Sequence, residues 1–154
     1  MIRHCISTGF KSPLVSTILL WSAVVGPALG QTPVPATSPE GGELSIELNS
    51  TETMSSGCRL TFMAVNTTGA DLGQVVLETV LFGKDGAVIT LSLFDFQDLP
   101  IAKPRVRQFD MAGQSCDGVG QILINGIDTC EGSSAEACQS ALKLTSRIEV
   151  EVQG

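Results

Sequence analysis

Four cysteines constrain the fold of this chain more than any other feature of its sequence: Cys58, Cys116, Cys130 and Cys138. The fifth cysteine, Cys5, lies in an N-terminal segment that we expect to be removed. An even number of cysteines in a small exported chain is typical of a disulfide framework. Zinc sites use close pairs such as C-x2-C together with histidine ligands, and no close pair of that kind occurs here. The sequence therefore predicts two disulfides, with a metal or redox site as the alternative.

The N-terminal segment has the order of a secretory signal peptide. Residues 1–30 begin with a basic stretch, continue with an apolar run over 14–25, and end in small residues before Gln31. The apolar run is shorter than the roughly 20 residues of a membrane span, so we expect cleavage rather than an uncleaved anchor. The sequence therefore predicts a periplasmic or secreted protein that does not insert into a membrane after signal cleavage.

Composition limits the partners and the chemistry of the exported part. Removal of residues 1–30 from the 154-residue chain leaves 124 residues, enough for one domain, with seven basic and 16 acidic side chains. This charge of −9 disfavours nucleic acid and anionic lipid as partners. The only histidine, His4, leaves with the signal, which excludes Ser-His-Asp and Cys-His mechanisms. We expect no enzyme and no cofactor; an enzyme would have to use carboxylates alone, as glycosidases do.

Alternating apolar residues predict strands along most of the remaining chain. Residues 31–42 are rich in proline and glycine and predict a flexible tether, and the folded domain is expected over 43–154. It opens on "ELSIELN", whose apolar residues share one face. Further strands are expected at 58–66, 74–82, 87–96, 104–111, 119–127 and 146–152, with a helical turn within 136–144. Seven short strands predict an all-β, antiparallel, immunoglobulin-like sandwich.

This strand order favours one disulfide connectivity. Cys130 and Cys138 enclose the polar stretch "EGSSAEA" and form the natural local pair, which leaves Cys58 for Cys116. In an immunoglobulin-like order the second and sixth strands run parallel on opposite sheets, so both thiols of the long pair lie at one end of the sandwich. The chain-entropy model gives roughly 2.5 kcal/mol for the short loop and about 4 kcal/mol for the long one.

The middle of the chain resembles a known family. The stretch "LTFMAVNTTGADLGQVVLETVLFGKDGAVI", followed by "PRVRQFDM", resembles the FxLYD-like group of small exported immunoglobulin-like domains. Leu81-Phe82-Gly83 stands where that family has Leu-Tyr-Asp. The whole chain also resembles small periplasmic proteins of Gram-negative bacteria. The resemblance implies a fold and a compartment, and it implies no catalytic residues.

A basic stretch, "KPRVR", is the main candidate for partner binding. It concentrates Lys103, Arg105 and Arg107 in an acidic chain, and strand alternation puts all three on one face. Such a face could dock an acidic protein, because arginine pairs well with carboxylates. The alternative is a solvated strand face that neighbouring acidic residues neutralise.

The strand at 87–96 is apolar on both faces. Phe94 and Phe96 share one face, and Leu91 and Leu93 share the other. We expect the second face to lie under the loop before Pro100; the alternative is an exposed apolar patch that meets a partner.

Other motifs have simpler interpretations. Asp95, Asp98, Asp110 and Asp117 are expected to serve turns rather than to bind calcium, since the interleaved Asp and Gly of a calcium loop are missing. Asn49 and Asn66 begin N-glycosylation triplets, and a turn explains Asn66 as well.

The sequence thus predicts a non-enzymatic, exported protein that binds an envelope or extracellular protein. Binding would use the basic stretch or an open sheet edge by strand addition. The alternative is a secreted inhibitor of an extracellular hydrolase, of protease or lysozyme type, that presents the loop "CEGSSAEAC" to its target.

Overall fold

The computed structural model describes residues 41–154. The expected signal peptide and nearly all of the expected tether lie outside the described residues. Within the described part, no helix is long and apolar enough to cross a membrane.

The described residues form eight strands and two short helices. Their order is β1 (Leu44–Met54), β2 (Gly57–Asn66), β3 (Leu72–Gly83), β4 (Val88–Leu99), β5 (Arg105–Ala112), η1 (Cys116–Gly118), β6 (Val119–Cys130), α1 (Ala135–Ala141), β7 (Leu142–Ser146) and β8 (Glu151–Gln153). Ser134 caps α1, because its hydroxyl accepts a hydrogen bond from the Ala137 amide.

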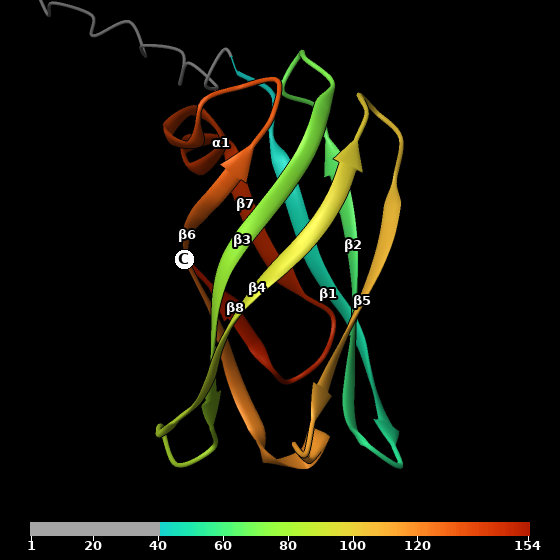
Figure 1. Cartoon of the computed structure of the whole chain (residues 1–154), viewed down its shortest axis with the longest axis vertical. Coiled ribbons are helices and arrows are strands. Elements are labelled where there is room, and N and C mark those ends of the chain that lie inside the picture. Colours follow the sequence, from blue (N-terminus) through green and yellow to red (C-terminus); the bar gives the residue numbers. More distant parts are fainter. Residues whose placement is uncertain (1–40) are drawn as a thin grey trace, which may run out of the picture. The chain divides into compact units, whose positions relative to one another are not determined.

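The strands form two four-stranded sheets, which confirms the expected all-β sandwich. The first sheet has the order β5-β2-β1-β7, and the second sheet has the order β4-β3-β6-β8 (Figure 1). Most neighbours are antiparallel, but β1 pairs with β7 and β6 pairs with β8 in parallel. β2 and β6 lie in opposite sheets, as the immunoglobulin-like order requires.

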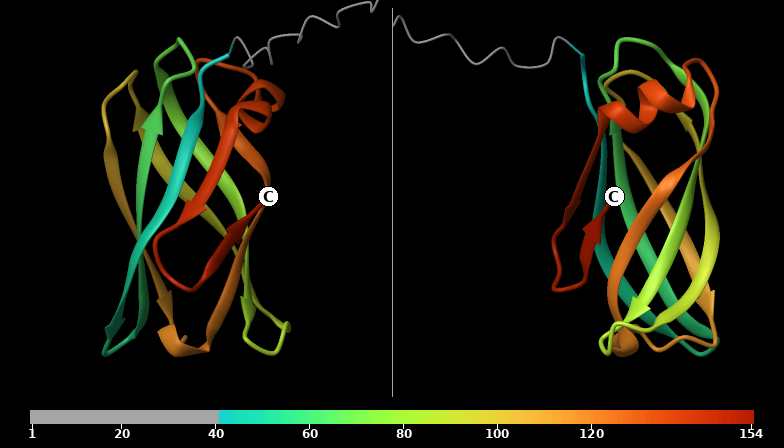
Figure 2. Two further views of the ribbon diagram at one scale, coloured as in Figure 1. Left: turned by 180° about the vertical axis from the view of Figure 1, so that it is seen from behind. Right: turned by 90° about the vertical axis from the view of Figure 1, so that its left-hand side faces the viewer.

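The C-terminal segment differs from the expected single strand over 146–152. It forms β7 and β8, which belong to different sheets and are joined by a bend. Ile148 and Val150 in this bend still pack against the core, which explains their alternating pattern. Figure 2 shows α1 at the end of the sandwich where β6 ends, with the chain then turning back along its side. The chain therefore closes the open side of the sandwich by crossing between the two sheets.

The core follows the alternation of the strands. Leu44, Ile46 and Leu48 of β1 are fully buried. Beside them, the rings of Phe62 and Phe109 from the first sheet and of Phe94 and Phe96 from the second form one cluster that joins the two sheets. Phe62 meets Phe94 edge to face with ring centroids 5.9 Å apart, a favoured aromatic geometry.

Two disulfides staple this core, with the expected pairing. Cys58 of β2 bonds to Cys116 of η1 across the two sheets, with their Cα atoms 4.9 Å apart. Cys130 at the end of β6 bonds to Cys138 of α1 and fixes the helix to the second sheet. Two disulfides are typical of proteins that fold in an oxidising, extracellular or periplasmic environment.

Candidate functional site

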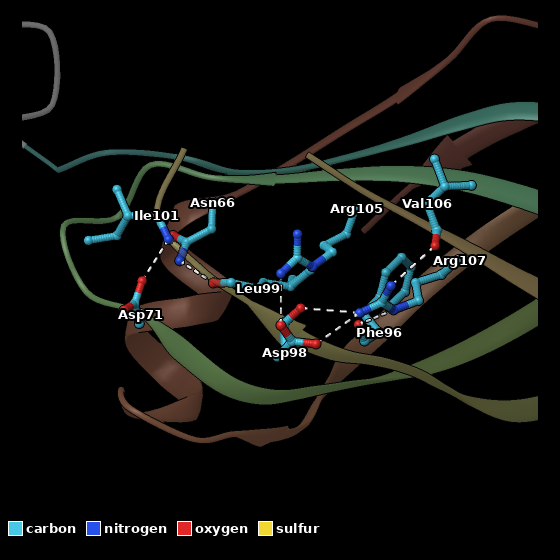
Figure 3. A network of polar contacts seen from close by, with 9 residues as sticks. All are labelled: Asn66, Asp71, Phe96, Asp98, Leu99, Ile101, Arg105, Val106 and Arg107. Atoms are coloured by element: carbon cyan, nitrogen blue, oxygen red, sulfur yellow. Dashed lines mark hydrogen bonds and ion pairs between the residues drawn. The ribbon is translucent and has the colours of Figure 1, made fainter. Parts of the chain in front are cut away.

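The arginines of the basic stretch point inward rather than into solvent. Arg105 and Arg107 share a face of β5 with Phe109 and Met111, so the expected common face exists but is the inner one. Because β5 and β4 are edge strands of opposite sheets, the long side chains reach across to β4. There the Arg107 Nε donates a hydrogen bond of 2.6 Å to the carbonyl oxygen of Phe96 (Figure 3).

Asp98 of β4 binds the guanidinium groups of both arginines. Arg105 Nη2 lies 3.0 Å from Asp98 Oδ2, and Arg107 Nη2 lies 3.2 Å from Asp98 Oδ1. Arg107 also donates to the backbone carbonyl of Asp98. The hydrogen bond from Arg105 lowers the pKa of the Asp98 carboxyl below its usual value, and both arginine charges add to this effect. These contacts neutralise the two arginines within the chain.

The β4–β5 connection carries unusual backbone conformations. Gln97 and Ala102 have φ of 57° and 56°, in the left-handed region that non-glycine residues rarely adopt. Asp95 holds the first position by accepting a hydrogen bond from the Gln97 amide. At the second position, the Ala102 amide donates to the carbonyl of Asn66. The connection is therefore fixed by hydrogen bonds on both sides.

Asn66 is the buried centre of this network. Its side-chain amide is fully buried and donates to the carbonyls of Ala70 and Leu99, at 2.8 and 2.7 Å. Its Oδ1 accepts from the Thr68 amide. Asn66 therefore stabilises a turn, which agrees with the turn interpretation of this triplet.

Lys103 is the one member of the basic stretch that forms no ion pair with another described residue. It lies in the connection before β5 and is exposed. The role of Lys103, Arg105 and Arg107 in partner binding stays a prediction. The contacts above agree with one part of the alternative, neutralisation of both arginines by a neighbouring acidic residue, although their face is not the solvated one.

The outer face of the first sheet is crossed by ion pairs. Arg59 of β2 pairs with Asp110 of β5 through two hydrogen bonds of 2.7 and 2.9 Å. The hydrogen bond from Arg59 lowers the pKa of Asp110, and the same bond raises the pKa of Arg59. Two more pairs join the ends of β1 and β7: Lys143 with Glu43, and Arg147 with Glu47.

The outer face of the second sheet is apolar and open. Leu91 and Leu93 are 72% and 58% exposed, so the expectation that a loop covers them is wrong. The chain leads away from this face after Leu99, because the connection to β5 crosses to the other sheet. In the register, Leu91 lies opposite Val80 of β3. We call six apolar residues of this face the apolar strip: Val80, Phe82, Val88, Leu91, Leu93 and Leu123.

Another hollow of the described residues lies elsewhere and offers little chemistry. It has a volume of about 670 Å³ and is lined by residues from β1, η1, β6 and the β7–β8 bend. Its charged residues are Lys84, Asp117, Glu149 and Glu151. The described residues contain no group of three or more potential metal ligands. The absence of an enzymatic function stays a prediction, since carboxylates and a lysine are present.

The loop between Cys130 and Cys138 is exposed but half helical. Residues 131–134 form the turn, and α1 begins at Ala135. The backbone amide of Glu136 and the Ser134 hydroxyl lower the pKa of the Glu136 carboxyl at this helix start. The helix leaves only the turn in a form that could enter a hydrolase cleft, and the inhibitor alternative stays a prediction.

Comparison of the chain with known protein families, with characterised proteins and with solved structures finds no match. The family resemblance noted from the sequence therefore stays an expectation. The functional argument depends on the surface of this chain alone.

Proposed function

We propose that this chain is an exported, non-enzymatic β-sandwich that acts by binding another protein of the cell envelope, in the periplasm or after secretion. One observation carries the proposal: Leu91 and Leu93, with Val88 at 55% exposure, lie uncovered on a sheet. Contiguous exposed apolar surface on a soluble domain is typical of an interaction site. The disulfides and the expected signal peptide support the compartment.

The apolar strip suits binding because its frame is rigid. β3 and β4 pair over nine register positions, and the side chains opposite the strip, such as Leu81 and Phe94, are fully buried. Covering the strip therefore costs this chain little conformational entropy. The basic stretch is the weaker candidate, because a partner would compete with Asp98 for the two guanidinium groups.

Cross-linking in living cells tests the proposal. A C-terminally tagged, exported copy is cross-linked and its captured proteins are identified by mass spectrometry. The test variant is Leu91→Ser with Leu93→Ser, and the matched control is Val106→Ser, which removes a 60% exposed apolar residue from the first sheet. We expect one dominant envelope protein that the test variant loses and the control keeps.

A third variant separates the two candidate surfaces. Lys103→Glu reverses a charge of the basic stretch without touching the contacts of Asp98. Capture that is lost with Lys103→Glu and kept with the leucine variant would move the binding site to the basic stretch. Capture of no specific protein by the folded, oxidised chain would reject the proposed function. Screening the chain against proteases and lysozymes would then test the inhibitor alternative.

A further inference from the structure

The apolar strip lies within a face that carries only negative charge. None of the four strands of the second sheet contains a lysine or an arginine. Glu78 of β3 lies directly opposite Leu93 in the register, and Asp95 lies two positions further along β4. Both carboxylates are on exposed residues. The nearest cation in sequence, Lys84, lies in the turn beyond the end of β3.

These carboxylates are bound only by neutral groups among the described residues. Asn125 Nδ2 donates to Glu78 Oε2 at 3.1 Å, and Gln74 Nε2 donates to Asp95 Oδ2 at 3.0 Å. Neither carboxylate has an ion-pair partner in the part of the chain that the structure describes. Their charge is therefore not neutralised within this face.

Charge and apolar surface meet in one hollow. An open depression of about 420 Å³ is lined by both kinds of residue: the polar Glu78 and Asn125, and the apolar Val80, Leu91 and Leu93. An apolar side chain that fills it brings its neighbours within reach of the Glu78 carboxylate. A cationic neighbour gains from that contact, and an anionic one is repelled.

We propose that the second sheet binds a basic, amphipathic polypeptide segment, whose apolar side chains cover the strip and whose lysines or arginines meet Glu78 and Asp95. This inference rests on the proposed function and names the kind of partner. A second copy of the chain fits less well, because two acidic faces without cations would be brought together. An anionic membrane is disfavoured for the same reason.

Two synthetic peptides test the charge preference. One is an amphipathic peptide of leucine and lysine, and the other has the same length and leucine pattern with glutamate in place of lysine. Binding to the purified, oxidised chain is measured by fluorescence anisotropy. We expect the lysine peptide to bind about tenfold more tightly than the glutamate peptide at low salt, and high salt to reduce the difference.

Variants locate the effect on the second sheet. Leu91→Ser with Leu93→Ser should abolish binding of the lysine peptide. Glu78→Lys should weaken it about fivefold, by the loss of one attractive contact and the gain of a repulsive one. The matched control is Glu52→Lys, which makes the same charge change at an exposed residue of β1 in the first sheet. It should leave binding unchanged. Thermal unfolding of each variant verifies the fold.

Three results would overturn the inference: equal binding of both peptides, no binding of either, or a dimer of the chain alone that the leucine variant abolishes. In each case the cross-linking experiment still reports separately on the proposed function. Leucine-dependent capture of an envelope protein would leave that function standing while the basic character of the partner is rejected.

Discussion

The two outer faces of this sandwich balance their charges in opposite ways. On the outer side of the first sheet, three cations have acidic partners: Arg59 pairs with Asp110, Lys143 with Glu43, and Arg147 with Glu47. None of the four strands of the second sheet carries a cation, and its outer face exposes Leu91 and Leu93. One face is neutralised by its own side chains, and the other is not.

We infer from this difference that the outer face of the second sheet carries the proposed binding surface. A face whose charges pair internally needs no partner, and its exposed ion pairs contribute little to stability. A face that exposes Leu91 and Leu93 leaves apolar area in water that another protein could cover. Position in the sandwich does not explain the contrast, because both faces are built from four strands on a common core.

The largest expected loss of stability follows from removing the disulfide that links the two sheets. Replacing Cys58 and Cys116 with alanine should lower the free energy of unfolding by about 4 kcal/mol, and replacing Cys130 and Cys138 by about 2.5 kcal/mol, because the first pair closes the longer loop. Denaturant unfolding of the two double variants measures this order. Equal losses would contradict the chain-entropy explanation.

A smaller loss in the free energy of unfolding is expected at the edge of the sandwich where β4 and β5 meet. Arg107→Met keeps much of the side chain's apolar length but leaves the carbonyls of Phe96 and Asp98 without their donor. We expect a loss of about 2 kcal/mol in the free energy of unfolding. The control is Arg147→Met, whose side chain is 59% exposed and should cost about 0.5 kcal/mol or less. Similar losses for both would mean that the inward-facing arginine is not structural.

Replacing the two exposed leucines of the apolar strip should change the free energy of unfolding very little. Leu91→Ser with Leu93→Ser should change the free energy of unfolding by only about 0.5 kcal/mol, since both side chains are already in water. Binding of a hydrophobic dye should fall with this variant and should fall less with Val106→Ser on the first sheet. A large loss of stability would instead mean that these leucines support the fold.

The sequence predicts the fold better than it predicts the surface. Alternation located the strands and the disulfide partners, because a half-buried strand leaves a period-two pattern wherever one face meets the core. It missed β7, since five residues after a helix carry too little pattern to separate a strand from the helix end. It merged the bend over 147–150 with β8, because the core contacts of a bend can alternate as a strand does.

The candidate surfaces show where such reasoning stops. Alternation grouped Arg105 with Arg107 correctly but could not tell that their face is the inner one, because polar residues usually mark the solvent side. At this edge of the sandwich, Arg107 turns inward and still reaches a carboxylate of the opposite sheet. The sequence did indicate the exposed leucines, because the outer face of a strand with two apolar faces is either covered by another segment or exposed to solvent. Which of these occurs depends on the path of the chain after Leu99, a tertiary property.

The smallest expected effect concerns pH and the paired carboxylates. Arginine contacts lower the pKa of Asp98 and of Asp110 in the folded state, relative to about 3.9 in an unfolded chain. Their contribution to stability is therefore fully present above that value and is lost as the pH falls through the lower, folded pKa. Asp110→Asn should flatten the acid side of the stability profile below about pH 4, and Arg59→Gln should flatten it in the same way, because each removes one half of the same pair. Urea unfolding across the acid range measures both profiles. If Arg59→Gln leaves the profile as steep as before, the Arg59 contact does not lower the pKa of Asp110 as the structure indicates. The contrast between the paired charges of the first face and the unpaired charges of the second would then be weaker.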